Sequence, residues 1–230
     1  MPRPGASRGA ARVIARPPAL GQSPRMILDP QTLSASAVYR FLIGVVVPRP
    51  IAFVSTIGTH GANVAPFSYF MPIGSSPPLL GVSIGLRHGE VKDTLANIRE
   101  TGDFVINVVT EDIAERMVHA SGDWPKEVDE FEIAGFSRMP SERVRSPRVA
   151  ESPVNLECRL YREVPLGDST LVVGELLCAR IDDALLVDGR VDVERLRPIG
   201  RLGGDGYAPL REVLHMPRPK VDRGGPEPAA

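Results

Sequence analysis

The residues best suited to bind a charged ligand lie between positions 87 and 94. Lys92 stands at the start of a predicted helix, and Arg87 and His88 precede it. Cations beside the free N–H groups of a helix N-terminus form a ready site for an anion. The segment lacks the G-x-x-x-x-G-K pattern of a nucleotide-triphosphate loop, so it favours a single phosphate. The alternative is that Lys92 and Asp93 are ordinary solvated residues of a helix start.

Two further segments have residue types that suit ligand contacts. The stretch NVAPFSYF (63–70) starts with an amide, is interrupted by Pro66 and has three aromatics in its last four positions, in a chain with only 5% aromatic residues. Proline cannot donate to a strand ladder, so this is not an ordinary buried strand. The stretch RLGGDGY (201–207) has three glycines, which permit close backbone approach or, more simply, a bare turn.

The segment GVSIG (81–85) formally matches the G-x-S-x-G nucleophile elbow. The elbow needs a sharp turn at the serine, whereas the residues on either side of Ser83 favour a continuing strand. We therefore predict no hydrolase. With a period of two, Gly81, Ser83 and Gly85 share one nearly bare strand face. Either a flat ligand or another backbone could approach that face, or a helix could pack closely against it.

Hydrophobic periodicity predicts a mainly β chain with peripheral helices. Turn signals separate the strands, and helices do not alternate regularly with them, so a closed or nearly closed antiparallel barrel is favoured over a doubly wound parallel sheet. Ser34 or Ser36 would cap the first helix, and Asp93 or Thr94 the second. A third helix would start at Thr110. The strands are predicted at about 51–57, 79–86, 104–109, 154–164, 171–181 and 196–202, and NVAPFSYF (63–70) begins a further strand that returns after the turn at 58–61.

Composition limits the protein's partners and its ordered region. The net charge of −1 gives no reason to expect nucleic acid or an anionic membrane as a partner, and no apolar run reaches about 18 residues. Residues 1–25 are rich in Ala, Arg, Pro and Gly and predict a disordered extension, with an organelle transit peptide as the weaker interpretation. We hypothesise that Met26 is the true start, that one domain covers 26–215, that 216–230 is a flexible tail, and that the protein is cytoplasmic.

Only two cysteines are present, Cys158 and Cys178. They cannot form a cysteine-rich zinc or iron–sulfur site. If a hairpin is centred on Asp168, the two thiols face each other across neighbouring strands. We predict that both are reduced core residues.

Four motifs in order carry a resemblance to a known family. PRPIAFVST (48–56), NVAPFSYF (63–70), KDTLANI (92–98) and RLGGDGY (201–207) resemble the flavin reductase-like FMN-binding family, the flavoredoxin-type branch of the split-barrel flavoproteins. The likeness covers roughly residues 26–215. It implies a Greek-key split β-barrel and a homodimer, with FMN bound non-covalently near the subunit interface.

The resemblance also implies roles for individual residues. Ser55, Thr56 and the helix start would hold the phosphate and ribityl end, the 63–68 segment would meet the polar ring edge, and Arg87 or Lys92 would lie near the ring. Arg201 and Tyr207 would contact the nicotinamide of NAD(P)H. No protein nucleophile, obligatory acid–base residue or metal is expected. The implied cofactor contacts are Ser55, Thr56, Asn63, Ala65, Pro66, Phe67, Ser68, Ser83, Arg87, Lys92, Asp93 and Thr94.

The leading function is therefore NAD(P)H-dependent flavin reduction, with hydride passing to flavin N5. Reduced flavin could then pass to a partner monooxygenase. The alternative is an electron-carrier flavoprotein that retains its FMN and exchanges electrons with a redox protein. A third class is a binding module that uses the same barrel without redox turnover.

Overall fold

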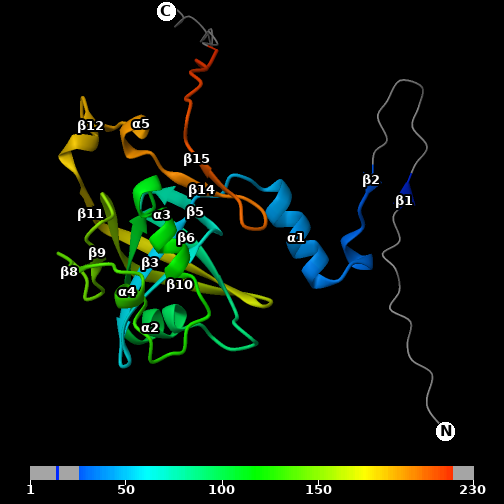
Figure 1. The fold of residues 1–230 in the computed structure, drawn as a ribbon, viewed down its shortest axis with the longest axis horizontal. Coiled ribbons are helices and arrows are strands. Elements are labelled where there is room, and N and C mark those ends of the chain that lie inside the picture. The colour runs from blue at the N-terminus through cyan, green and yellow to red at the C-terminus, as the bar shows by residue number, and fades with distance from the viewer. Residues whose placement is uncertain (1–13, 16–25, 220–230) are drawn as a thin grey trace, which may run out of the picture.

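Seven strands form one antiparallel sheet that curls into a barrel (Figure 1). The structure is a computed structural model that describes residues 14–15 and 26–219. The strand order is β4-β3-β7-β10-β11-β6-β5. The strands are β3 (Ala52–Gly58), β4 (Gly61–Phe67), β5 (Phe70–Ser75), β6 (Pro78–Gly85), β7 (Asp103–Val108), β10 (Val154–Leu166) and β11 (Ser169–Ile181).

The connection between β4 and β5 brings the two ends of the sheet together. These strands are the two edges of the sheet, yet only Ser68 and Tyr69 join them along the chain. The sheet must therefore curl until its edges meet at this point, although β4 pairs only with β3. The expected Greek-key split β-barrel is confirmed. One edge of β4 remains free for other contacts.

Two hydrophobic clusters lie on opposite faces of the curled sheet. Because successive side chains of a strand alternate between faces, Val54 and Phe53 belong to different clusters. The inner cluster fills the barrel and includes Val54, Val82, Ile84, Phe104, Ile106, Cys158 and Val172, closed by Leu95 and Ile98. The outer cluster packs short helices against β3 and β4 and includes Phe53, Val64, Met117, Phe131 and Phe136.

The helices surround the barrel, and the first one lies apart from it (Figure 1). The α-helices are α1 (Ala35–Val45), α2 (Asp93–Thr101), α3 (Ala114–Ala120), α4 (Glu130–Ile133) and α5 (Val193–Leu196). The 3₁₀ turns are η1 (Pro30–Thr32), η2 (Glu111–Ile113) and η3 (Asp183–Leu185). Two-residue strands are β1 (Ile14–Ala15), β2 (Met26–Ile27), β8 (Arg138–Met139), β9 (Arg148–Val149), β12 (Leu186–Val187) and β13 (Arg190–Val191); β14 (Ile199–Arg201) and β15 (Tyr207–Pro209) are longer.

Several local predictions need correction. Ser34 caps α1 as expected, but α2 has Lys92 at its N-cap position, and a lysine side chain offers no acceptor to the helix amides. Thr94 lies inside α2, and its hydroxyl donates to Asn63. Thr110 precedes η2 without a side-chain cap bond. The strand predicted at 196–202 shrinks to β14, since α5 occupies Val193–Leu196.

The cysteine pairing was wrong. Cys178 pairs with Glu157, and Cys158 with Leu176, because a bulge shifts the register between Glu157 and Cys158. Both cysteines are free thiols. Burial and the nearby Glu157 carboxylate raise the pKa of Cys158 to about 12. That thiol is therefore an inert core group rather than a nucleophile.

The nucleophile-elbow interpretation of Ser83 is excluded by its position within a strand. Ser83 is the sixth residue of β6 and pairs with Leu171 of β11, without a strand-to-helix turn. On the bare face, a Cβ at Gly81 would come within 2.7 Å of the Ile73 side chain. At Gly81 that face is therefore filled by the Ile73 side chain, whereas Ser83 on the same face lines an open hollow.

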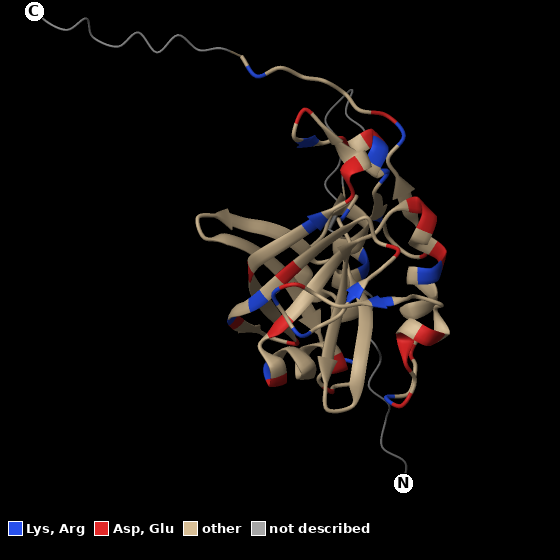
Figure 2. Cartoon of the chain, turned by 90° about the vertical axis from the view of Figure 1, so that its left-hand side faces the viewer, with Lys and Arg blue, Asp and Glu red and all other residues tan. Residues whose placement is uncertain are grey.

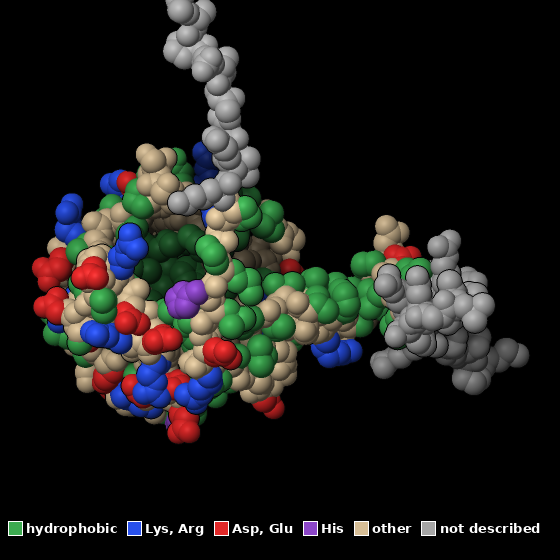
Figure 3. All heavy atoms as spheres, turned by 90° about the horizontal axis from the view of Figure 1, so that it is seen from above, with side chains coloured by type: hydrophobic (Ala, Val, Ile, Leu, Met, Phe, Trp, Pro, Cys, Tyr) green, Lys and Arg blue, Asp and Glu red, His purple; other side chains and the backbone are tan. Residues whose placement is uncertain are grey.

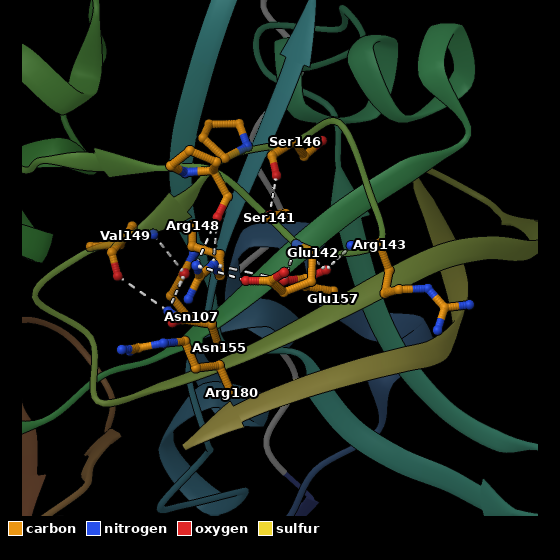
Figure 4. Close-up of polar contacts among 12 residues, drawn as sticks. Asn107, Ser141, Glu142, Arg143, Ser146, Arg148, Val149, Asn155, Glu157 and Arg180 are labelled. Atoms are coloured by element: carbon orange, nitrogen blue, oxygen red, sulfur yellow. Dashed lines mark hydrogen bonds and ion pairs between the residues drawn. The ribbon is translucent and has the colours of Figure 1, made fainter. Parts of the chain in front are cut away.

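A buried polar network anchors the 141–149 segment against β7 and β10 (Figure 4). Asn107 accepts from the Val149 amide and from Asn155, both at 2.9 Å. The buried Glu157 carboxylate accepts from the amides of Glu142 at 2.9 Å and Arg143 at 2.7 Å. This carboxylate orders a loop and is not available to a ligand.

Charges of both signs are interspersed over the view in Figure 2, without a surface of a single sign. Within residues 14–15 and 26–219, none of the helices has the length and apolar character that a membrane crossing requires. Most of the predicted N-terminal extension, and the end of the predicted tail, lie outside the described residues.

Candidate functional site

A groove of two adjoining cavities follows the free edge of β4. The inner cavity is lined by Asn63, Ala65, Pro66, Arg87, Lys92, Asp93, Thr94, Ala120, Ser121, Gly122 and Glu130. The outer cavity is lined by Ile51, Pro66, Ser68, Met117, Ser121, Arg201 and Tyr207. The cavities adjoin, because they share Pro66 and Ser121, and together they are called the groove, with a cationic end at Lys92 and an aromatic end at Tyr207.

Lys92 is the central cation of the first end. Its Nζ lies 5.3 Å from the centroid of the Phe67 ring, and it forms no ion pair with a carboxylate of the described residues. Burial, and then repulsion by Arg87, hold the pKa of Lys92 below its usual range. The adjacent start of α2 carries no side-chain cap, so its first N–H groups are free to bind an anion.

Arg87 and His88 tie the loop after α3 to this end of the groove. Arg87 Nε lies 3.0 Å from the Asp123 carboxylate, and its Nη1 donates to the Trp124 carbonyl at 3.3 Å. His88 Nε2 contacts the same carboxylate at 2.9 Å. This hydrogen bond, reinforced by the charge of Arg87, lowers the pKa of Asp123. The exposed Asp123 carboxylate therefore shows that Arg87 and His88 already attract a negatively charged group.

A buried chain of hydrogen bonds fixes Asn63 in the wall of the groove. The Thr94 hydroxyl donates to Asn63 Oδ1 at 2.8 Å, and Asn63 Nδ2 donates to Glu130 Oε1 at 3.0 Å. These contacts set the amide orientation and leave one amide N–H of Asn63 for another acceptor. Burial, and secondarily the nearby Asp93, raise the pKa of Glu130.

Replacing Glu130 with glutamine is expected to increase stability relative to wild type as the pH rises above the usual pKa of a glutamate carboxyl and through the raised pKa of Glu130. The raised pKa means that the folded chain holds this proton more tightly than the unfolded chain, so the wild type loses stability as the pH rises through that pKa. Glutamine keeps the acceptor for Asn63 and does not titrate. Urea unfolding over this pH range checks the result, and parallel stability profiles for both proteins would contradict it.

The other end of the groove combines a hydroxyl, a guanidinium and an aromatic ring. Ser68 follows β4 directly, while Arg201 and Tyr207 lie on the paired strands β14 and β15. The Arg201 guanidinium lies 4.4 Å from the centroid of the Tyr207 ring. Backbone hydrogen bonds between Arg49 and Arg201 hold this pair of strands against the barrel. A planar ligand could lie against the resulting surface.

The structure gathers most, but not all, of the predicted residues in the groove. Ser55 is fully buried, and its hydroxyl donates to the Pro147 carbonyl at 2.5 Å while accepting from Asn107. Thr56 is also fully buried and accepts from Asn97. Both hydroxyls therefore have partners in the core and do not face the groove.

Ser83 and Phe67 occupy the edges of the candidate site. Ser83 lines a separate apolar hollow of about 450 Å³, which borders the groove at Ser68. Phe67 is buried in the barrel and supports Lys92 from below. Sequence reasoning missed Arg49, Ser121 and Glu130. Only the position of Arg49 between two prolines at the start of β3 gave a local signal.

A larger cavity beside the groove is a poor site for an anion. It has a volume of about 470 Å³. Five carboxylates line it, from Asp93, Glu100, Glu127, Asp129 and Glu130, against the single ammonium of Lys126 and the imidazole of His60. The charge of its walls therefore favours the smaller groove for a phosphate.

Known proteins show the same sequence family and fold. Residues 45–195 match the family model described as "Flavin reductase like domain". Nitrilotriacetate monooxygenase component B from Bacillus cereus is 32% identical, with a TM-score of 0.82 over 85% of this chain and 100% of that one. The 2-nitrobenzoate 2-nitroreductase of Pseudomonas fluorescens is 34% identical, with a TM-score of 0.78 over 86% and 100%.

An uncharacterized protein from Aquifex aeolicus is 42% identical over 74% of this chain and 88% of its own length. The family model matches well over half of the chain, and the match spans all seven strands of the sheet, from β3 to β11. The chain belongs to the flavin reductase-like family of split-barrel proteins.

Proposed function

We propose that this chain binds FMN non-covalently in the groove and catalyses its reduction by NAD(P)H. The observation that carries the proposal is the order of groups along the free edge of β4. One end has a half-buried ammonium that pairs with no carboxylate of residues 26–219, and an uncapped helix start. Polar groups beside an aromatic ring lie at the other end. This order matches a molecule with a phosphate at one end and a planar ring at the other.

The groups present fit FMN chemically. Lys92, Arg87 and the N–H groups at the start of α2 would hold the phosphate. Asn63, Ser68 and the unpaired backbone edge of β4 would meet the polar edge of the ring. Bound FMN would supply the hydride-accepting N5. The protein would orient the ring and keep one face accessible to a nicotinamide near Arg201 and Tyr207.

A second copy of the chain would complete the site. The two cavities, of about 60 and 160 Å³, are too small to enclose FMN, so part of the ligand would lie on open surface. Next to the ring end, the apolar hollow is bordered by Leu42 and Val46 at the end of α1. None of the residues of α1 is buried, although hydrophobic side chains run along it as it projects from the body (Figure 3). An exposed helix with several large apolar side chains belongs in an interface, so we propose a homodimer.

Replacing Leu42 with glutamate is expected to convert a dimer into a monomer and to weaken FMN binding. Leu42 is 43% exposed in one chain and lines the apolar hollow, so a dimer would bury it and the glutamate would place a charge in that interface. Light scattering after size exclusion gives the mass. Arg40→Glu is the matched control, because Arg40 is an exposed residue of α1 that does not line the hollow. A wild-type monomer would contradict the dimer.

The experiment that tests the function is anaerobic reduction followed by absorbance. Purified protein with FMN is mixed with NADH or NADPH in a stopped-flow instrument. Rapid bleaching of the flavin absorbance supports a reductase. A protein that retains FMN but is bleached slowly by both nucleotides would instead be an electron carrier, and one that binds no FMN would be a module of another kind. The similarity to a monooxygenase component B supports a partner monooxygenase as the recipient of reduced flavin.

A further inference from the structure

Two arginines are buried among the described residues, and they differ in their surroundings. Arg148 lies near two carboxylates, at 3.7 Å from Glu157 and 3.8 Å from Glu142 (Figure 4). Arg49 is 6% exposed and forms no ion pair with any carboxylate of the described residues. A buried charge without a counter-ion is costly, so the position of Arg49 calls for an explanation.

The guanidinium of Arg49 has four hydrogen-bond acceptors. Nη1 donates to the carbonyls of Ile43 at 2.9 Å and Val46 at 2.7 Å, in the last turn of α1 and at its C-cap. Nη2 donates to the Leu202 carbonyl at 2.9 Å. These three bonds connect α1 to the turn after β14, where the negative end of the helix dipole attracts the cation. They would be sufficient for a purely structural clamp.

The fourth bond reaches the ligand groove. Arg49 Nε donates to Ser68 Oγ at 3.2 Å. A guanidinium has no acceptor, so Ser68 must accept here, and its own hydroxyl proton points elsewhere. Ser68 donates to no acceptor of the described residues and lines the ring end of the groove. A clamp alone does not need this bond, whereas a site for a ring with acceptor atoms does.

Resting on the proposed function, we propose that Arg49 is a positioning residue for bound FMN that favours its reduced form. Through Ser68, it would fix a hydrogen-bond donor at the ring end of the groove. A hydroxyl that accepts from a cation is a stronger donor, and donors or cations beside the ring favour the extra negative charge of reduced FMN.

The test measures the dissociation constants of oxidised and chemically reduced FMN. Ser68→Ala removes the donor and leaves the three bonds of the clamp. We expect the preference for reduced FMN to fall about tenfold, the effect of one charge-assisted hydrogen bond, which lowers the two-electron midpoint potential by about 30 mV. Arg49→Gln should lower the preference for reduced FMN at least as much as Ser68→Ala does. Arg49→Lys keeps the positive charge but lacks the planar guanidinium, so its preference for reduced FMN should lie between those of Arg49→Gln and the wild type.

Ser75→Ala is the matched control for the potential. Ser75 is an exposed serine of β5 that lines neither cavity of the groove. Its loss should leave the midpoint potential unchanged. If Ser68→Ala keeps the wild-type preference while Arg49→Gln lowers the melting temperature, Arg49 is only a structural clamp. That result would overturn this inference and leave the proposed function standing. A wild-type chain that binds neither form of FMN would overturn the proposed function as well.

Discussion

Replacing Lys92 with alanine is expected to weaken FMN binding by about 30-fold and to leave riboflavin binding almost unchanged. A hydrogen bond to a charged group contributes about 1.5–3 kcal/mol, so its loss corresponds to a tenfold to hundredfold change in affinity. Riboflavin has the same ring and ribityl chain without the phosphate, and it therefore reports on the rest of the groove. Quenching of flavin fluorescence on titration gives both dissociation constants.

The matched control for this variant is Lys126→Ala. Lys126 lines the acidic cavity and not the groove, so its removal should not weaken FMN binding. Equal losses for FMN and riboflavin in Lys92→Ala would show that Lys92 supports the ring or the fold. No loss for either ligand would place the phosphate elsewhere.

The lowered pKa of Lys92 adds a pH dependence with a defined sign. Burial and Arg87 disfavour the charged ammonium, so the cation is lost at a lower pH than for an exposed lysine. The FMN affinity of the free protein should therefore decrease on the alkaline side. Lys92→Arg should remove this decrease, because arginine does not deprotonate in this range.

The strands were predictable because their signals are local. Alternating apolar residues and flanking turns located β3, β6, β7, β10 and β11 to within a few residues, with β10 and β11 the longest. The predicted pairing of the two cysteines was wrong because a bulge depends on packing between strands and not on the sequence of either strand. The predicted cap of α2 was wrong because the helix begins one residue earlier than expected, so Asp93 and Thr94 lie inside it and Lys92 takes the N-cap position.

Site residues that lie close together along the sequence were predictable. Those that only the fold brings together were less so. Lys92 and Thr94 start α2, and Asn63 and Ser68 lie on or just after β4, so motif reasoning found all four. The burial of Ser55 depends on Pro147 and Asn107, which lie 92 and 52 residues away along the chain. Glu130 joins Asn63 across 67 residues, a contact that no local pattern encodes.

Replacing Phe53 with alanine is expected to cost about 3–5 kcal/mol of folding free energy, the largest stability loss of the variants considered. Phe53 is fully buried, and its ring centroid lies 5.1 Å from that of Phe136. The outer cluster cannot fill the resulting cavity without moving α3 and α4 against β4. For a chain of this size, the melting temperature should fall by roughly 10 °C, measured on the protein without flavin.

The Phe53→Ala variant also tests whether the outer cluster supports the wall of the groove. Met117 and Ala120 of α3 belong to the outer cluster, and they also line the groove opposite β4. A loosened cluster should therefore weaken FMN and riboflavin binding by similar factors, in contrast to Lys92→Ala. Val118→Ala, on the exposed side of α3, is the control and should change stability by less than about 0.5 kcal/mol. If Phe53→Ala lost stability but bound both flavins as the wild type does, the helices would not form a wall of the binding site.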